Sequence, residues 1–258
     1  MTTTANARSP LAIITGGSRG LGRNMALHLA ERGVDILFTY RAAEAAAHAV
    51  AAEISAKGRT AALLQLDVAD RASVRAFPAA VKATLERTWQ RDRFDFLVNN
   101  AGTGLHASFA DTSEAQFDEL MNIHLRAPFF VTQGLLPLIA DGGRILNVSS
   151  GLARFALPGS SAYGTMKGGV EVLTRYLAKE LGARKITANV IAPGAIETDF
   201  SGGAVRDNPA INQMVAANTA LGRTGKPDDI GGAVALLLSP EAGWITGQRI
   251  EFSGGMFL

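Results

Sequence analysis

The chain has 258 residues, of which 47% are hydrophobic and 19% are charged, and its formal net charge is +2. These values are typical of one soluble domain with a sizeable core, and no basic cluster indicates a nucleic-acid partner. Cysteine is absent, which excludes disulfides, a thiolate nucleophile and cysteine-based metal sites. No apolar run approaches the roughly 18 residues of a membrane span. We therefore expect a cytoplasmic protein without a nucleic-acid or membrane partner.

Short apolar segments alternate with longer helical patterns along the chain. Strands are expected at residues 11–15, 34–40, 60–68, within 94–102, and at 143–150, 186–194 and 248–252. Helices are expected at 20–33, 42–57, 71–89, 113–139, 160–182 and 227–238, with kinks at Pro78 and Pro128. This alternation predicts an α/β fold, with a single Rossmann-like doubly wound parallel β-sheet and helices on both faces.

The domain boundaries follow from composition. Residues 1–9 are polar and lack the apolar core of a signal peptide, so we expect a flexible tail there. Residues 10–258 should form one dinucleotide-binding oxidoreductase domain. The segment at about 195–222 is rich in glycine and asparagine and is expected to be a loop. Within it, residues 197–220 should form a mobile lid over a substrate.

The first expected strand runs directly into the glycine turn "TGGSRGLG", which opens the first helix. Gly16, Gly20 and Gly22 let the backbone approach a ligand closely. Free amides at the helix start attract an anion, with the helix dipole behind them. The spacing is not the common GxGxxG, and no lysine follows as in a P-loop. The turn therefore indicates a phosphate site, against the simpler interpretation of a tight connection.

The end of the second expected strand indicates which dinucleotide is bound. A carboxylate there would hold a ribose hydroxyl, but Tyr40 and Arg41 occupy this position, and Asp35 lies at the opposite end of the strand. Arg19 in the glycine turn could approach the same place. Two guanidinium groups suit a 2′-phosphate. This pattern favours NADP(H), while NAD(H), with both arginines merely solvated, stays open as the alternative.

Tyr163 and Lys167 are one helical turn apart, so they share a face of the expected helix. A free tyrosine has a pKa near 10, and an adjacent ammonium group lowers it. Such a phenol could exchange a proton with a carbonyl or alcohol oxygen near neutral pH. Ser150, at the end of a strand, could hydrogen-bond the same oxygen. The alternative for this weak motif is a tyrosine packed in the core.

The chain resembles the short-chain dehydrogenase/reductase family over about residues 10–258, including its 3-oxoacyl-[acyl-carrier-protein] reductase-like branch. The resemblance rests on "TGGSRGLG", "LDV", "NNAG", "NVSS", "YGTMK", "PGAIET" and "ITGQRIEFSGG", in this order. It implies a catalytic set of Asn122, Ser150, Tyr163 and Lys167. It implies cofactor contacts from Gly16, Ser18, Arg19, Gly20, Leu21, Gly22, Tyr40, Arg41, Asp67, Val68, Asn100, Ala101, Gly102, Tyr163, Lys167, Pro193, Gly194, Ile196 and Thr198. It also implies a homotetramer.

Some of these assignments have competitors. Asn122 resembles an asparagine that holds a water in a proton relay, and its alternative is a polar residue that kinks the helix. Ser149 is a weaker candidate than Ser150, because neighbouring side chains on a strand point apart. Met166 stands where the family often has serine, so it could touch the cofactor pocket.

The remaining polar and apolar candidates carry less information. His28 and His48 are expected on surfaces, and His124 should face away from Asn122, whereas His106 could line the substrate cleft. No histidine or acidic cluster has metal-ligand spacing, and hydride transfer needs no metal. The apolar side chains that could line a substrate site, or simply pack in the core, are Phe155, Leu157, Phe200 and Met214.

The leading hypothesis is NADPH-dependent reduction of a ketone or aldehyde, with Tyr163 as proton donor and a small-molecule substrate. Within the same chemistry, the alternatives are 3-oxoacyl-[acyl-carrier-protein] reduction and an alcohol dehydrogenase running toward oxidation. From a different class, the alternative is a non-catalytic NADPH-binding sensor. The Ser150, Tyr163 and Lys167 set argues against the sensor.

Overall fold

The structure, a computed structural model, describes residues 8–258. The expected tail therefore lies mostly outside the described residues. Ser9, its last residue, is already held in place, because its hydroxyl accepts a hydrogen bond from Arg59 at 2.8 Å and its carbonyl accepts one from Arg91 at 3.2 Å.

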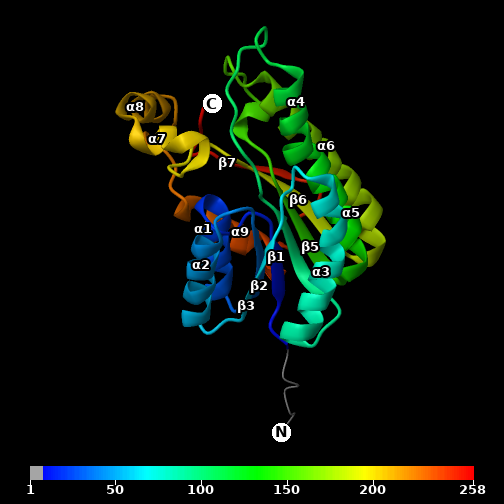
Figure 1. Cartoon of the computed structure of the whole chain (residues 1–258). Helices are drawn as coiled ribbons and strands as arrows, with labels where there is room; N and C mark the ends of the chain where they lie inside the picture. The colour runs from blue at the N-terminus through cyan, green and yellow to red at the C-terminus, as the bar shows by residue number, and fades with distance from the viewer. Residues whose placement is uncertain (1–7) are drawn as a thin grey trace.

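A parallel sheet forms the centre of the molecule (Figure 1). Its strand order is β3-β2-β1-β4-β5-β6-β7, and every neighbouring pair is parallel. The strands are β1 (Leu11–Ile14), β2 (Asp35–Tyr40), β3 (Ala61–Gln65), β4 (Phe94–Asn99), β5 (Ile139–Val148), β6 (Thr187–Pro193) and β7 (Arg249–Phe252). The order reverses between β1 and β4, which confirms the predicted doubly wound fold.

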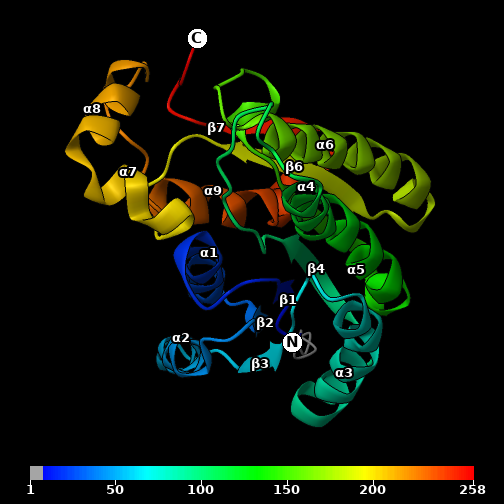
Figure 2. The ribbon, with the colours of Figure 1, turned by 45° about the horizontal axis from the view of Figure 1, so that its top comes forward.

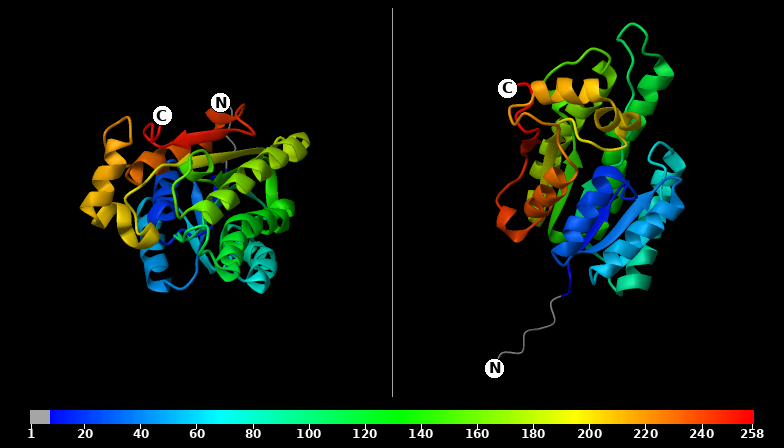
Figure 3. Two further views of the ribbon diagram at one scale, coloured as in Figure 1. Left: turned by 90° about the horizontal axis from the view of Figure 1, so that it is seen from above. Right: turned by 90° about the vertical axis from the view of Figure 1, so that its left-hand side faces the viewer.

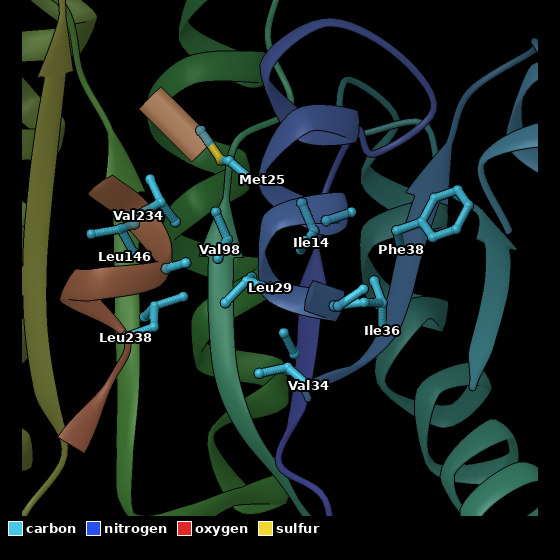
Figure 4. Close-up of a cluster of buried hydrophobic side chains, with 14 of the residues drawn as sticks. Ile14, Met25, Leu29, Val34, Ile36, Phe38, Val98, Leu146, Val234 and Leu238 are labelled. Atoms are coloured by element: carbon cyan, nitrogen blue, oxygen red, sulfur yellow. The ribbon is translucent and has the colours of Figure 1, made fainter. Parts of the chain in front are cut away.

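Helices cover both faces of this sheet (Figure 2). One face carries α1 (Gly20–Glu31), α2 (Glu44–Ala56) and α9 (Asp228–Leu237). The other carries α3 (Arg71–Trp89), α5 (Ala127–Leu135) and α6 (Ser161–Leu181). Because both faces are covered, β1 is buried at all four positions, with Ile14 in one core and Ile13 in the other. Figure 4 shows the first core, where Met25 and Leu29 of α1 pack beside Val234 of α9.

The long helix expected at 113–139 is not one continuous α-helix. It consists of α4 (Glu114–Met121), a π-helical turn (Asn122–Arg126), α5 and a short 3₁₀ turn (Leu136–Leu138). Ser113 begins α4 with a capping box that it shares with Gln116. Pro128 lies in the first turn of α5, where its missing N–H matters little. The π turn therefore separates two α-helices, and π turns are frequent at functional sites.

The prediction of a loop at 195–222 is wrong in its centre. This segment contains a short 3₁₀ turn (Phe200–Gly203), α7 (Ala204–Asp207) and α8 (Pro209–Ala217). Asn208 caps α8, because its side-chain oxygen accepts hydrogen bonds from the amides of Ala210 and Ile211. Asparagine and proline thus start a helix here and do not form an irregular loop. Both helices lie outside the two helical layers (Figure 3).

The residues after β7 return to this helical segment. The amides of Ala220 and Leu221 donate to the carbonyls of Gly255 and Gly254, and Thr219 forms a bridge with Met256. The C-terminal residues are thereby attached to the chain that leaves α8. No helix within residues 8–258 is both long and apolar enough to cross a membrane.

Candidate active site

A pocket with a volume of about 430 Å³ opens at the carboxyl ends of the strands. It brings together all but one of the residues expected at the site. Those that line it are Gly16, Ser18, Arg19, Gly20, Leu21, Gly22, Tyr40, Arg41, Asp67, Val68, Asn100, Ala101, Gly102, Ser150, Tyr163, Lys167, Pro193, Gly194, Ile196 and Thr198. The exception is Asn122.

The glycine turn forms one wall of the pocket. Gly16 has a φ of +69°, which disfavours any side chain, and a Cβ at Gly22 would collide with the carbonyl oxygen of Gly16. The turn is held to β2, because the amide of Gly16 donates to Thr39 Oγ1 at 3.0 Å. No side chain caps the start of α1. Its first amides can therefore bind an anion, as the turn predicts.

Asn100 supports this turn. Its side-chain amide donates to the carbonyls of Thr15 and Gly16, both at 3.0 Å. The backbone amides of Asn100 and Ala101 donate in turn to Thr15 Oγ1. The side chain expected to contact the cofactor therefore also fixes the shape of the cradle that would receive it.

The far end of the pocket carries positive charge. Arg19 and Arg41 are both exposed, and neither guanidinium group has a hydrogen-bond or ion-pair partner within residues 8–258. The Asp67 carboxylate is already engaged, since it accepts a hydrogen bond from the amide of Ala69 at 2.9 Å. Two cations thus face this end of the pocket, and neither forms an ion pair with the Asp67 carboxylate that also lines it.

The two neighbouring serines point in different directions. Ser149 Oγ donates to Glu171 Oε1 at 2.7 Å, so its hydroxyl is turned away from the phenol. Ser150 begins a 3₁₀ turn (Gly151–Ala153), and its Oγ accepts a hydrogen bond from the amide of Leu152 at 3.2 Å. The Ser150 hydroxyl also hydrogen-bonds the Tyr163 phenol, so the two groups lie together at one place in the pocket.

Tyr163 and Lys167 share the first two turns of α6 as expected. The Lys167 ammonium group lies 5.4 Å from the centre of the Tyr163 ring and donates to the carbonyl of Val148 at 2.8 Å. This hydrogen bond attaches the catalytic helix to the end of β5. Lys167 is buried, and its aliphatic chain fills space between α6 and the sheet.

The acidities of this pair differ from the sequence expectation. Burial raises the pKa of the Tyr163 phenol, and only a hydrogen bond with Ser150 opposes the rise. Burial also lowers the pKa of Lys167 from its ordinary value to about 7. The expectation that the lysine lowers the phenol pKa considered the charge and left out desolvation, which dominates here. A phenol with a raised pKa stays protonated at neutral pH, as a proton donor must.

Asn122 does not line the pocket. It is the first residue of the π turn, and its buried side-chain oxygen has no hydrogen-bond partner within residues 8–258. His124, two residues further on, does line the pocket and lies against Tyr163. His124 and Asn122 face different directions, as expected, but it is His124 that reaches the pocket. The only sequence signal for it was a histidine within the apolar run "NIHLRAPFF".

Apolar side chains enclose the end of the pocket near the phenol. Phe155, Leu157 and Phe200 line it as expected, and the Phe200 ring lies 6.2 Å from that of Tyr163. Met214 does not line it and is 47% exposed. Neither Met166, which is buried in the core, nor the exposed His106 reaches it. The lining residues that the sequence did not indicate include Thr103, Leu152, Val205 and Met256.

Backbone and hydroxyl groups form the edge after β6. The amide of Gly194 donates to the carbonyl of Phe252, which fixes this edge to β7. Thr198 is 8% exposed, and its Oγ1 accepts a hydrogen bond from the amide of Phe200 at 3.2 Å. Its hydroxyl hydrogen can therefore still be donated to a ligand. No group of three or more histidine, aspartate or glutamate side chains within residues 8–258 could hold a metal ion.

Known proteins resemble the chain over almost its whole length. A family model described as enoyl-(acyl carrier protein) reductase matches residues 16–257. The hydroxynaphthalene reductase-like protein Arp2 of Metarhizium brunneum is 35% identical over 256 residues, which cover 95% of this chain and 94% of that protein.

Solved structures show the same likeness. The reductase LugOII, described as catalysing keto-reduction at C1 during lugdunomycin biosynthesis, superposes with a TM-score of 0.92 at 35% identity, covering 98% of this chain and 100% of that one. The angucycline C-6 ketoreductase LanV with bound NADP superposes with a TM-score of 0.91 at 34% identity, covering 96% and 95%. With this likeness, its sheet order and its glycine turn, the chain belongs to the short-chain dehydrogenase/reductase family.

Proposed function

We propose that this chain is an NADPH-dependent reductase that converts a ketone on a flat aromatic molecule into an alcohol. The observation that carries the proposal is the single pocket that joins a phosphate cradle at one end to Ser150, Tyr163 and Lys167 at the other. Between the two ends lies room for a dinucleotide and a ring system.

The residues present fit NADP(H). The uncapped start of α1 suits the pyrophosphate. Arg19 and Arg41, exposed beside Tyr40 and without acidic partners within residues 8–258, suit a 2′-phosphate. Thr198, with its free hydroxyl hydrogen, suits a carboxamide. When bound, the reduced nicotinamide supplies the hydride that adds to the carbonyl carbon.

The side chains of the chain itself handle the oxygen of the ketone. Ser150 donates a hydrogen bond to this oxygen and orients it. Tyr163 gives the oxygen its phenolic proton. The adjacent Lys167 cation stabilises the phenolate that remains. Phe155, Leu157 and Phe200 keep water from this end of the pocket.

The aromatic substrate class is supported by the lining of the pocket. Phe200 and Phe155 offer ring faces and edges for stacking against a flat molecule. Of the described lid residues, Arg206 is already paired with Asp199 and Asp207, so it offers no free cation for a highly charged substrate. The names of the relatives point the same way, since they include ketoreductases and a hydroxynaphthalene reductase-like protein.

Location and assembly are part of the proposal. The absence of cysteine suits the reducing cytoplasm. Exposed aromatic side chains lie on neighbouring helices, with Phe117 on α4, Phe129 and Phe130 on α5, and Tyr176 on α6. Such a patch suits burial against further copies of the chain, and we expect a homotetramer.

The test measures consumption of NADPH and NADH in parallel. The substrate panel contains bicyclic aromatic ketones such as tetralones, a 3-oxoacyl thioester, a diketone and an aromatic aldehyde. We expect NADPH and an aromatic ketone to give the highest kcat/KM. Tyr163→Phe removes the proton donor and should lower kcat by about 10²-fold or more.

The matched control is Tyr176→Phe, which makes the same change on the exposed side of the same helix. It should keep the rate of the unchanged chain. Preference for the thioester would contradict the substrate class, and preference for NADH would contradict the role of Arg19 and Arg41. NADPH binding without turnover of any compound would support the alternative of a non-catalytic NADPH-binding sensor.

A further inference from the structure

The π turn between α4 and α5 carries a buried histidine that the chemistry above does not use. His124 is 1% exposed and lies on the wall of the pocket. Its ring meets the Tyr163 ring edge to face, with 5.0 Å between the ring centres and 81° between the ring planes. Aromatic pairs favour this arrangement, so each ring restricts the movement of the other.

The imidazole also lies against a glycine. A Cβ placed on Gly102 would stand 2.8 Å from His124 Cε1 and 3.3 Å from Nδ1. The backbone conformation of Gly102 does not demand glycine, because its φ lies outside the left-handed region. A side chain at position 102 is therefore excluded by lack of space, because the imidazole occupies that space. Gly102, His124 and Tyr163 form a continuous stack from the end of β4 to the phenol.

A hydrogen bond fixes the ring within this stack. His124 Nε2 lies 2.8 Å from the carbonyl oxygen of Thr103, to which it donates. The amide of Thr103 also approaches Nε2, at 3.4 Å, but the shorter contact is to a carbonyl, which can only accept, so we assign the proton to Nε2. The buried Nδ1 then carries none and has no partner within residues 8–258. The imidazole is neutral, since burial and the nearby Lys167 charge lower the pKa of His124 to about 3. A neutral ring adds no charge that would compete with Lys167 beside the phenol.

We propose that His124 is the positioning residue of Tyr163, and that Gly102 must be glycine because the His124 ring fills the space of its side chain. The inference rests on the proposed function, because it concerns the proton donor of that reaction. This role differs from the one expected of Asn122, which begins the same π turn but does not line the pocket. The loop after β4 thereby sets the position of a phenol on α6.

A double-mutant cycle between Gly102 and His124 tests this stack. Gly102→Ala should push the imidazole against Tyr163 and lower kcat by about tenfold or more, because small displacements of a reacting group are costly. His124→Asn should also lower kcat, and it removes the Cε1 atom that the new methyl group would meet. In the His124→Asn background, Gly102→Ala should then lower kcat by less than about threefold. Such coupling is typical of residues in contact.

The KM for NADPH should stay near that of the unchanged chain in both His124 variants, since the histidine acts on the phenol. His48→Asn makes the same substitution on exposed α2 and serves as the control. If the reductions in kcat caused by Gly102→Ala and His124→Asn simply multiply, Gly102 is restricted by the cofactor and not by His124, and the proposal is overturned.

A second variant tests the role of His124 if Gly102→Ala does not fold. His124→Gln retains a side-chain amide that can donate to Thr103 but has no ring to hold Tyr163. We expect a folded protein with a lowered kcat and an unchanged KM for NADPH. Full activity in His124→Gln would overturn the proposal.

A readout independent of turnover is the ¹⁵N NMR signature of His124 in the free protein. It should show the neutral ring with its proton on Nε2 and no titration across the neutral range, and a ring that titrates there would contradict the arrangement. The outcomes separate the two proposals. Turnover that survives Tyr163→Phe defeats the proposed function, whereas turnover that needs Tyr163 but shows no Gly102–His124 coupling defeats only this inference.

Discussion

Residue identity alone misleads about the acidity of the two central side chains. A lysine one turn from a tyrosine suggests a lowered phenol pKa, yet both side chains are buried and desolvation acts on each. Burial penalises the charged form, so the phenol keeps its proton and the lysine loses one more readily. In the direction of ketone reduction this suits the chemistry, because the phenol starts as the donor.

The lowered pKa of Lys167 predicts a pH dependence. Below about 7 the side chain is a cation that can stabilise the phenolate, and above this value the cation is progressively lost. The kcat/KM for NADPH, which reports on the free enzyme, should therefore fall as the pH rises through about 7. Lys167→Arg, which cannot lose its charge in this range, should remove the decline from whatever activity it retains. A flat profile in the unchanged chain would contradict this prediction.

Two elements position the proposed catalytic residues, and a buried hydrogen-bond network holds these elements in register. Asn99 on β4 donates to Thr132 on α5 at 2.9 Å and to Asn147 on β5 at 2.8 Å. Asn147 donates in turn to Thr174 on α6 at 2.9 Å. All four side chains are buried. This hydrogen-bond network therefore connects β5, the strand that leads to Ser150, with the helix that carries Tyr163.

Breaking this hydrogen-bond network should lower the stability of the protein. Asn147→Leu removes one of the two hydrogen bonds that each neighbour makes, so that Asn99 keeps only Thr132 and Thr174 only the carbonyl of Val170. We expect the free energy of unfolding to fall by about 1–3 kcal/mol. Urea unfolding followed by circular dichroism measures the change. The control is Gln213→Leu at an exposed position, which should change the free energy of unfolding by no more than about 0.5 kcal/mol. Equal losses of unfolding free energy in both variants would show that the buried hydrogen-bond network contributes no more to stability than an exposed side chain.

At the scale of the whole molecule, α4, α5 and α6 carry exposed aromatic side chains, of which Phe130 has the guanidinium group of Arg126 4.7 Å from the centre of its ring. Phe129 and Phe130 lie 5.1 Å apart by ring centres and are 44% and 40% exposed. Burying such side chains against another copy is favourable by about 25 cal/mol per Å² of apolar surface.

We predict that light scattering of the purified protein gives four times the mass of one chain. Phe130→Glu should shift the protein toward smaller species, because it places a charge in the apolar contact. His48→Glu, on exposed α2, is the control and should leave the mass unchanged. A monomer in the unchanged chain would refute the tetramer.

The sequence by itself determined the order of strands and helices, the glycine turn, and more than half of the residues that line the pocket. Local rules suffice for these features, because glycine, strand alternation and one-turn spacing act over a few residues. It did not reveal the helices at 204–217, where the pairing of Asn208 with Pro209 outweighs a loop-like composition. Nor did it reveal the π turn, which rotates His124 onto the pocket wall and takes Asn122 off it.

Only the tertiary structure decided the acidity of Tyr163 and Lys167, the stack of Gly102 against His124, and the buried hydrogen-bond network of Asn99 and Asn147. Each of these depends on burial or on contact between segments far apart in the sequence. Desolvation and steric exclusion depend on what surrounds a group in space, and the surroundings of a residue are not contained in its sequence neighbours.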